Sequence, residues 1–308
     1  MASRRSTSRR TQILVGFTAV AFALAACGGG SSKPSASSSS GGAKPKITVG
    51  AANFAENTLL ANIYALALQH AGYQTSVKQL TTREVIIPAI EHGDLQLEPD
   101  YAATLLTFLK GNASGDVTQT VTNLRAKLPS TLHALQPAPA VDTNGFVVTK
   151  ATAQKYNLSK MSDLAPVAPK FVLGGAPECP QRPYCLPGLE KTYGLHFKSF
   201  KPLDTGGPIT VAAVKTGKVD VGELFTTDPS ITANNFVLLQ DDKHLQNADN
   251  IIPIVNASVD SPQLDSVLNQ VNAKITTDVL TQLVAAVSLQ HHTPQEVAAG
   301  FLSAVGLG

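Results

Sequence analysis

Aromatic and charged residues are both scarce in this chain. Tryptophan is absent, aromatic residues make up 6% and charged residues 15% of the 308 positions. The formal net charge is only +2, and the arginines at positions 4, 5, 9 and 10, in a segment that we expect to be removed, account for part of it. Because binding to a phosphate backbone requires a basic surface, this composition argues against nucleic acid as a partner.

Sequence motifs of the common catalytic classes are missing as well. The chain contains no G-x-S-x-G, no H-E-x-x-H and no phosphate-cradling glycine loop, and its seven histidines are scattered. We therefore expect no enzyme, no metal site and no cofactor. A hydrolase assembled from side chains that only the fold brings together stays as an alternative, and it would show a perturbed acid or nucleophile in a cleft.

The first thirty residues have the pattern of an export signal. A basic stretch ending at Arg10 precedes an uncharged apolar stretch over residues 13–26, too short to span a bilayer but suited to a signal-peptide core. It ends at Leu-Ala-Ala-Cys27, which resembles the bacterial lipobox, so we predict a lipoprotein signal peptide over residues 1–27 with Cys27 as the lipid anchor. The alternative is an ordinary signal peptide with an incidental cysteine. The pattern leaves open whether the general secretory or the twin-arginine route exports the chain.

A segment without apolar periodicity follows the predicted anchor. Residues 28–45 consist mainly of Gly, Ser, Ala, Lys and Pro. Such a segment cannot bury enough surface to fold, so we predict a flexible tether. Together with a multiply acylated cysteine, this tether would hold the folded body at the outer face of the cytoplasmic membrane.

Two further cysteines, Cys179 and Cys185, lie in a proline-rich stretch of the body. They are not spaced as C-x-x-C and no histidine lies close to them in sequence, which disfavours redox and zinc chemistry. In an exported chain, a single remaining pair so close in sequence most often forms a disulfide. We predict a structural disulfide between Cys179 and Cys185 that shapes a local hairpin.

Apolar periodicity in the body of the chain alternates between strand and helix. The pattern predicts strands and helices over residues 47–50, 55–71, 73–80 and 83–92, a third strand from Leu95, and helices from about residue 263 to the end. The last helix opens with Thr293-Pro-Gln-Glu296, a capping box with proline at its first position. This alternation favours an α/β fold in which helices cover a mostly parallel sheet.

One pattern occurs twice. Residues 89–97 and 213–221 each read as the end of a helix, a glycine stop and an alternating strand, and each is followed four residues later by an aromatic residue, Tyr101 or Phe225. This repeat predicts two related α/β lobes, each with an aromatic side chain at the carboxyl end of a strand. Ligands bind at that edge in open α/β sheets. Coincidence between two common helix-glycine-strand units is the alternative.

Several stretches of the sequence resemble one known family. They are the run from Ile47 to Glu56, Thr82-Arg-Glu, Glu98-Pro-Asp-Tyr, Arg182-Pro-Tyr-Cys-Leu-Pro-Gly, Leu203-Asp-Thr-Gly-Gly and Leu224-Phe-Thr-Thr-Asp. They occur in the order typical of osmoprotectant-binding proteins, the substrate-binding components of importers for glycine betaine, choline and carnitine. The resemblance runs from about Lys46 to the C-terminus.

The resemblance implies a two-lobed, type II periplasmic-binding-protein fold, in which each lobe is a mixed sheet flanked by helices and two hinge crossovers connect the lobes. Residues 46–143 plus 252–308 would form lobe one and residues 144–251 lobe two, with hinges near 137–144 and 251–256. Lobes of this type close over a small ligand by hinge bending. The implied partners are an importer permease and its ATPase, and we expect a monomer.

The resemblance also implies a ligand site. Several aromatic side chains surround a quaternary ammonium group in this family, because ring faces attract a cation that cannot form hydrogen bonds. Tyr101 and Phe225 match aromatic positions, whereas Asn144 and Leu186 stand where further rings are expected. The predicted cage is therefore incomplete. The predicted ligand contacts are Tyr101, Thr104, Asn144, Phe225, Asn53, Leu186 and Asp142.

The incomplete cage leaves more than one function open. The first is capture of an osmoprotectant with a quaternary amine, with Tyr184 of the cysteine hairpin as the nearest substitute ring. The second is the same fold binding a non-quaternary polar or phenolic solute through the amides of Asn53 and Asn144. The third is a surface lipoprotein that binds a protein partner, which would expose a large apolar patch. Glu223 is expected to be solvated.

Overall fold

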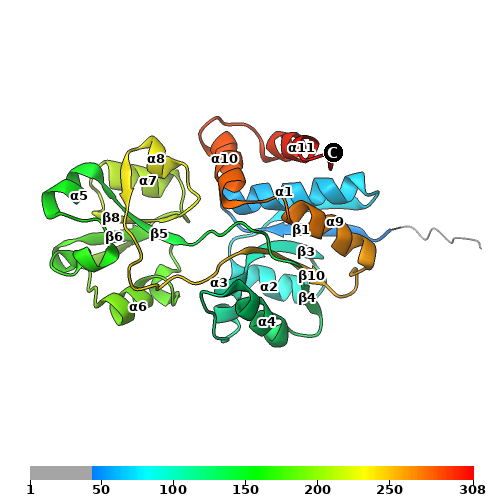
Figure 1. The fold of residues 1–308 in the computed structure, drawn as a ribbon, viewed down its shortest axis with the longest axis horizontal. Coiled ribbons are helices and arrows are strands. Elements are labelled where there is room, and N and C mark those ends of the chain that lie inside the picture. The colour runs from blue at the N-terminus through cyan, green and yellow to red at the C-terminus, as the bar shows by residue number, and fades with distance from the viewer. Residues whose placement is uncertain (1–43) are drawn as a thin grey trace, which may run out of the picture. The chain divides into compact units, whose positions relative to one another are not determined.

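The computed structural model describes residues 44–308. The predicted signal peptide, the predicted anchor Cys27 and nearly all of the predicted tether lie outside the described residues. Within residues 44–308, none of the helices is both long and apolar enough to cross a membrane. This part of the chain forms two five-stranded sheets with helices packed against them (Figure 1).

The first sheet has the strand order β2-β1-β3-β10-β4. Its strands are β1 (Lys46–Ala51), β2 (Gln74–Gln79), β3 (Leu97–Tyr101), β4 (Leu132–Ala134) and β10 (Ile251–Asn256). β1 runs parallel to β2 and β3, whereas β10 is antiparallel to both of its neighbours, β3 and β4. The sheet is therefore mixed, as the family resemblance implies, and not mostly parallel.

Helices cover both faces of the first sheet (Figure 1). On one face lie α1 (Ala55–His70), α9 (Pro262–Asn272), α10 (Thr277–Ser288) and α11 (Pro294–Ala304), and on the other α2 (Arg83–Glu91), α3 (Ala102–Phe108) and α4 (Val117–Lys127). Side chains alternate across a strand. Ile251 and Val255 of β10 therefore pack in the core on the side of α1, and Ile252 and Ile254 pack in the core on the side of α2.

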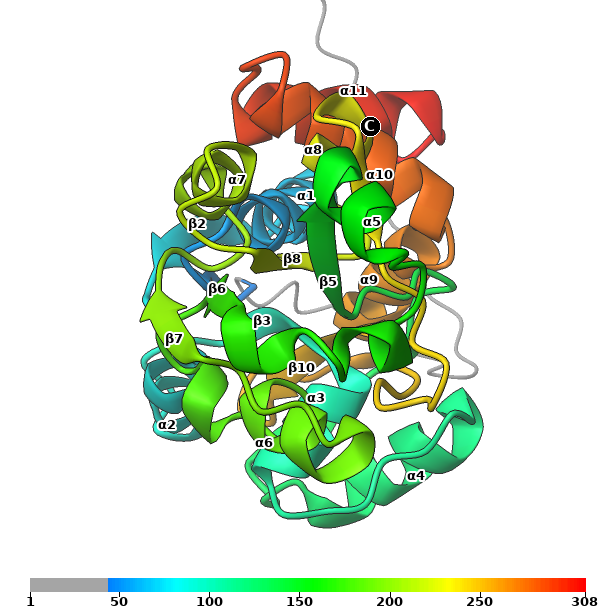
Figure 2. The same ribbon diagram turned by 90° about the vertical axis from the view of Figure 1, so that its left-hand side faces the viewer.

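The second sheet has the order β7-β6-β8-β5-β9. Its strands are β5 (Asn144–Thr149), β6 (Val172–Gly175), β7 (Ser199–Pro202), β8 (Val221–Phe225) and β9 (Phe236–Leu238). Its helices are α5 (Lys150–Tyr156), α6 (Leu186–Gly188), α7 (Pro208–Lys215) and α8 (Ser230–Ala233), with short turns η1 (Met161–Leu164), η2 (Ala168–Lys170), η3 (Cys179–Gln181) and η4 (Leu189–Tyr193). Figure 2 shows α7 and α8 on one side of these strands and α6 on the other.

The pattern that occurs twice in the sequence is a structural repeat. Gly93 and Gly217 both have a positive φ, 84° and 71°, which glycine adopts without steric cost. In each copy the N–H groups of the next two residues donate to the carbonyl of the alanine that opens the pattern, Ala89 or Ala213. The strands that follow, β3 and β8, occupy the same central place in sheets of the same order. The predicted repeat is confirmed.

Two segments connect the sheets, residues 135–143 and residues 239–250. An antiparallel bridge joins them at Val141 and Asn250. The resemblance implies a hinge strand near residues 251–256, and these residues form the strand β10, which is buried and pairs with β3 and β4. The second connection leads directly into this strand.

Helix ends follow the sequence closely. α1 ends at His70, and Gly72 after it has a φ of 86°, as expected for a glycine stop. The capping box of α11 is formed as predicted. The N–H of Glu296 donates to the hydroxyl of Thr293 (3.2 Å), and the N–H of Thr293 donates to the carboxylate of Glu296 (2.9 Å).

The core packing of α1 gives a stability prediction. Leu60 is fully buried in the core between α1 and the first sheet. Leu60→Ala should lower the free energy of unfolding by about 2–5 kcal/mol, because it removes buried apolar surface and leaves a cavity. Urea denaturation measures this change. Ile209→Ala is the control, since Ile209 is 60% exposed. Equal effects of the two substitutions would contradict the assignment of this core.

Candidate functional site

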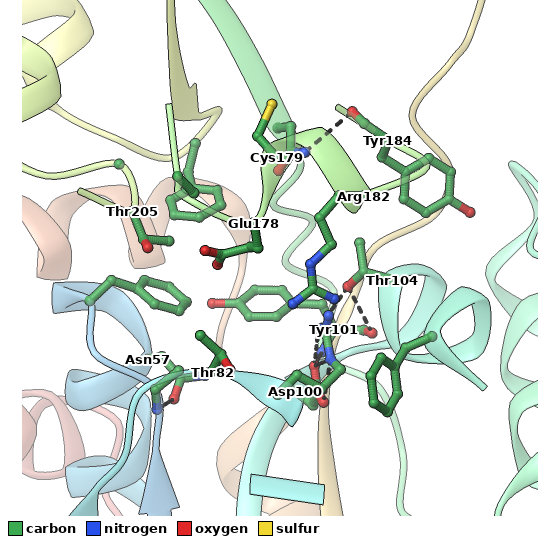
Figure 3. A pocket seen from close by; sticks show the side chains of 18 of the residues that line it. Asn57, Thr82, Asp100, Tyr101, Thr104, Glu178, Cys179, Arg182, Tyr184 and Thr205 are labelled. Atoms are coloured by element: carbon green, nitrogen blue, oxygen red, sulfur yellow. Dashed lines mark hydrogen bonds and ion pairs between the residues drawn. The ribbon is translucent and has the colours of Figure 1, made fainter. Parts of the chain in front are cut away.

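A cavity of about 720 Å³ is lined by residues of both sheets (Figure 3). Strand ends supply much of its wall: Tyr101 ends β3, Phe225 ends β8, Asn144 begins β5, and Ala52 and Ala176 directly follow β1 and β6. β1 and β3 are parallel, as are β6 and β8, so each pair opens its carboxyl ends at one edge of its sheet. The cavity therefore lies where open α/β sheets bind ligands.

Five of the seven predicted contacts line this cavity. They are Tyr101, Thr104, Asp142, Asn144 and Phe225. Their positions in sequence are far apart, and the two connections and the paired strand ends bring them together. Tyr101 pairs with Ile251 at the edge of the first sheet, as Phe225 pairs with Asn144 in the second.

Asn53 and Leu186 do not line the cavity and need correction as predicted contacts. The side chain of Asn53 is at the surface, where its oxygen accepts a hydrogen bond from Gln79 (3.1 Å). Leu186 begins α6 and packs against the apolar core of the second sheet that includes Cys179 and Cys185. Asn53 therefore bonds to a neighbouring side chain at the surface, and Leu186 packs on the core, instead of contacting the cavity.

Phe54, which was not among the predicted contacts, lies between the two predicted rings. Its ring centroid is 6.2 Å from that of Tyr101 and 5.1 Å from that of Phe225, with interplanar angles of 28° and 33°. The sequence carried a signal for it. Phe54 is the N-cap residue of α1 after β1, just as Tyr101 is the N-cap residue of α3 after β3. The three rings are called the ring cluster below.

The floor of the cavity contains a partly buried ion pair. The guanidinium of Arg83 contacts the carboxylate of Asp100 and donates to the hydroxyl of Thr104 (2.9 Å). Asp249 accepts hydrogen bonds from the N–H groups of Ala103 and Thr104 (2.8 and 3.0 Å) at the start of α3. Burial raises the pKa of Asp249 to about 7. Thr104 is therefore fixed from two sides.

The Cys179–Cys185 segment reaches across the cavity. The structure has a disulfide between these cysteines, with a Cα–Cα distance of 5.2 Å. From this segment, Arg182 pairs with Glu84 of α2 (2.9 Å), and the hydroxyl of Tyr184 lies 2.7 Å from that of Thr107 in α3. In Figure 3 the side chain of Arg182 extends from this segment toward Tyr101 and Thr104. The disulfide segment thus joins the two halves over the cavity.

Glu223 is a buried acid in the cavity wall and not the solvated residue expected from the sequence. It is 7% exposed, and its carboxylate accepts a hydrogen bond from the N–H of Ala176 (3.1 Å). Burial, and to a lesser extent the charge of Glu178, raise the pKa of Glu223 to about 7, against the opposing effects of the Ala176 hydrogen bond and of Arg182. The cavity therefore contains an acid that titrates near neutral pH.

Metal binding has one geometric candidate within residues 44–308. Cys179, Cys185 and Glu223 place possible ligand atoms within 4.8 Å of one another. The two sulfur atoms are bonded to each other, whereas metal binding by cysteine requires the thiolate. This group does not form a metal site while the disulfide is intact.

Comparison with known proteins agrees with this geometry. A family model described as the substrate-binding domain of the ABC-type glycine betaine transport system matches residues 45–304. The chain belongs to this family. Its members are transport substrate-binding proteins, which agrees with the strand-end cavity and with the two related sheets.

Individual relatives differ in the solute that they are named for. The chain is 30% identical to the glycine betaine-binding protein YehZ of Escherichia coli, over 84% of this chain and 90% of that protein. It is 27% identical to the ergothioneine transport permease/ergothioneine binding protein EgtU of Helicobacter pylori, over 72% of this chain and 40% of that protein. A solved structure titled as a glycine betaine/carnitine/choline ABC transporter shares the fold, with 24% identity, a TM-score of 0.68, and coverage of 85% of this chain and 99% of that one.

Glu223 gives a prediction on pH and stability. Its pKa of about 7 in the folded protein, against an ordinary value of 4.5, means that folding favours the protonated form. The associated stability is present below pH 4.5 and is lost as the pH rises through 7. Glu223→Gln should remove about 3 kcal/mol of this loss, measured by urea denaturation across the range.

Glu190→Gln is the matched control, because Glu190 is exposed. It should keep the pH dependence of the wild-type chain. If Glu223→Gln changes stability with pH as steeply as the wild-type chain does, Glu223 does not hold a proton in the folded cavity.

Proposed function

We propose that this chain is the extracytoplasmic solute-binding component of an ABC importer and that it captures a zwitterion with a quaternary ammonium group in the 720 Å³ cavity. The ring cluster carries this proposal. A quaternary ammonium ion cannot donate or accept hydrogen bonds, so a protein selects it with ring faces, whose quadrupole attracts a cation. Phe54, Tyr101 and Phe225 offer such faces from the ends of strands in both sheets.

The missing ring at Asn144 does not argue against this ligand class. The amide of Asn144 donates to the main-chain carbonyl of Tyr184 (3.3 Å), so its role is to hold the disulfide segment in place. Phe54 supplies a ring that was not among the ligand contacts predicted from the sequence. The site thus has three clustered rings, with Tyr184 and Phe108 as two further rings in the cavity wall.

Arg182 suits the acidic end of a zwitterion. Its side chain is 22% exposed and lines the cavity, and its partner Glu84 is 50% exposed, so the pair is accessible to an incoming carboxylate. Arg83, in contrast, is already committed to the buried Asp100. A guanidinium binds a carboxylate through two parallel hydrogen bonds. Glycine betaine and carnitine have such a group, and choline does not.

The cavity volume favours a second candidate within the same class. Sites of 300–1,000 Å³ enclose drug-sized ligands, and glycine betaine is far smaller than that. A betaine with an additional ring, such as ergothioneine, would fill more of the 720 Å³ and could use Tyr184 and Phe108 in the wall. The similarity to both named relatives is compatible with either solute.

Capture would involve closure of two lobes, residues 46–143 plus 252–308 and residues 144–251, about the two connections. The contacts Arg182–Glu84 and Tyr184–Thr107 across the cavity support this. A permease and its ATPase would receive the solute from a monomeric receptor. Cys27, outside the described residues, would anchor the receptor at the outer face of the cytoplasmic membrane.

Ligand titration tests the proposal. Isothermal titration calorimetry with glycine betaine, carnitine, choline and ergothioneine should give binding for at least one of them. Phe54→Ala should weaken it by about 10-fold to 50-fold, because a desolvated ring face contributes about 2 kcal/mol to binding a cation. Tyr156→Ala, at an exposed ring of α5 outside the cavity, should leave affinity unchanged. Absence of heat with all four solutes would overturn the proposal.

The proposed role of Arg182 can be tested by comparing a ligand that has a carboxylate with one that lacks it. Arg182→Gln should weaken glycine betaine by about 10-fold or more and leave choline within about threefold, because choline lacks a carboxylate. Glu84→Gln breaks the same ion pair but keeps the guanidinium, so it serves as the control for closure. Equal losses for both ligands with both variants would mean that Arg182 acts only in closure.

A further inference from the structure

An acidic pair lies behind the ring cluster, in part outside the ligand cavity. Glu56, in the first turn of α1, is 3% exposed and does not line the cavity, and Asp142, in the first connection, is 2% exposed and does. The charged groups that face Glu56 are Asp142 and Asp228, both acidic. Burial raises the pKa of both Glu56 and Asp142, and the charge of Glu56 raises that of Asp142 further. Thr227 donates hydrogen bonds to both carboxyl groups, which places them side by side, and two adjacent buried carboxyl groups retain a proton between them.

Both oxygens of Glu56 are engaged, and by different halves of the molecule. The hydroxyl of Tyr101, at the end of β3, donates to Oε1 (2.7 Å). The hydroxyl of Thr227, just after β8, donates to Oε2 (2.5 Å). Asp142 accepts hydrogen bonds from the N–H of Thr227 and the hydroxyl of Thr226, each at 3.0 Å. Glu56 is thus a direct link between the ring of Tyr101 and the segment that follows Phe225.

The side chain of a tyrosine at a cavity wall can rotate or move away from the cavity. A hydrogen bond to its hydroxyl group restricts both motions. Tyr101 is 8% exposed and its ring lies 6.2 Å from Phe54, with its hydroxyl directed to Glu56. The orientation of its face toward a ligand therefore depends on Glu56. The position of Thr227, and with it the end of β8, depends on the same carboxyl group.

We propose that Glu56 is the positioning residue of the ligand site. A proton shared with Asp142 keeps Glu56 bound to Tyr101 and Thr227, and this fixes the positions of the rings from the two sheets relative to each other. Loss of this proton leaves two carboxylates in contact, which repel each other and separate. The ring cluster then loosens, and affinity for the zwitterionic solute falls as the pH rises. The link to solute affinity rests on the proposed function, whereas the shared proton does not.

A second, small cavity lies beside Glu56. It has a volume of about 30 Å³ and is lined by Glu56, Thr227 and Asp228, together with Phe54 and Phe225, which also line the ligand cavity. This volume can hold a water molecule next to polar partners. The two phenylalanines separate it from the ligand. A water molecule at this place would give Glu56 a partner for proton exchange apart from the solute site.

The proposal is tested on the full chain with glycine betaine as the probe, titrated by calorimetry at about pH 6 and about pH 8.5. The affinity of the wild-type chain should fall between these values by about 10-fold or more. Glu56→Gln is neutral at every pH and keeps an oxygen for Tyr101, so its affinity should fall less steeply than that of the wild-type chain between the two pH values. Glu56→Ala should weaken binding by about 10-fold to 100-fold at both values, because it leaves buried hydroxyls unpaired.

A double substitution separates positioning from a general loss of structure. Tyr101→Phe removes the hydroxyl that Glu56 binds, so Glu56→Ala should add less than about threefold to its effect. Glu190→Gln, at the exposed surface, is the control and should bind as the wild-type chain does. Equal affinity of Glu56→Ala and Glu56→Gln, or full additivity with Tyr101→Phe, would overturn the positioning role.

Ligand-free unfolding decides on the proton independently of the solute. The free energy of unfolding of the wild-type chain should decrease between about pH 5 and about pH 8.5, and less steeply for Glu56→Gln, because raised carboxyl pKa values favour folding at low pH. Equal slopes would overturn the shared proton. If no solute binds the wild-type chain but these slopes differ, the proposed function fails while the shared proton stands.

Discussion

The carboxyl ends of parallel strands leave a sheet at one edge, and here two such edges line a single cavity. This constraint decides which residues can meet. Phe54 and Tyr101 follow or end strands of the first sheet, and Phe225 ends a strand of the second. Asp249 and Asn144 lie at the far ends of the two connections and reach the same place from the opposite direction. Separation in sequence therefore has little influence on which residues line the cavity.

Local patterns predicted much of this arrangement, and long-range pairing explains what they missed. The helix-glycine-strand repeat located Tyr101 and Phe225, because periodicity and a glycine stop are properties of short segments. The resemblance implied a hinge strand at residues 251–256, and pairing with β3 and β4 makes them a strand inside the first sheet. Glu223 was expected to be solvated, and Glu56 was not among the predicted site residues. Their burial depends on Thr227 and Ala176, which are distant in the chain.

Several buried carboxyl groups line the same cavity as the rings. Glu223 and Asp249 each have a pKa raised to about 7, and that of Glu98 is raised well above its ordinary value, in each case chiefly by burial. In the floor of the cavity, Asp100 pairs with a cation, the partly buried Arg83. A cation that enters such a site meets groups that can ionise in response, so the wall can adapt its charge to its occupant. Ring faces and latent acidity are two ways of attracting positive charge without a permanent negative charge.

The first sheet is completed by a strand that follows the whole of the second sheet in the chain. β10 enters the first sheet only after the chain has traversed the second, and β5 opens the second sheet directly after the first connection. β3 thus stays without its antiparallel neighbour until about residue 256 has been delivered. Contacts between such distant segments are slow to form because closing long loops costs entropy early. Folding of the first sheet is therefore expected to wait for the chain up to about residue 256, whereas the second sheet is complete within residues 144–238.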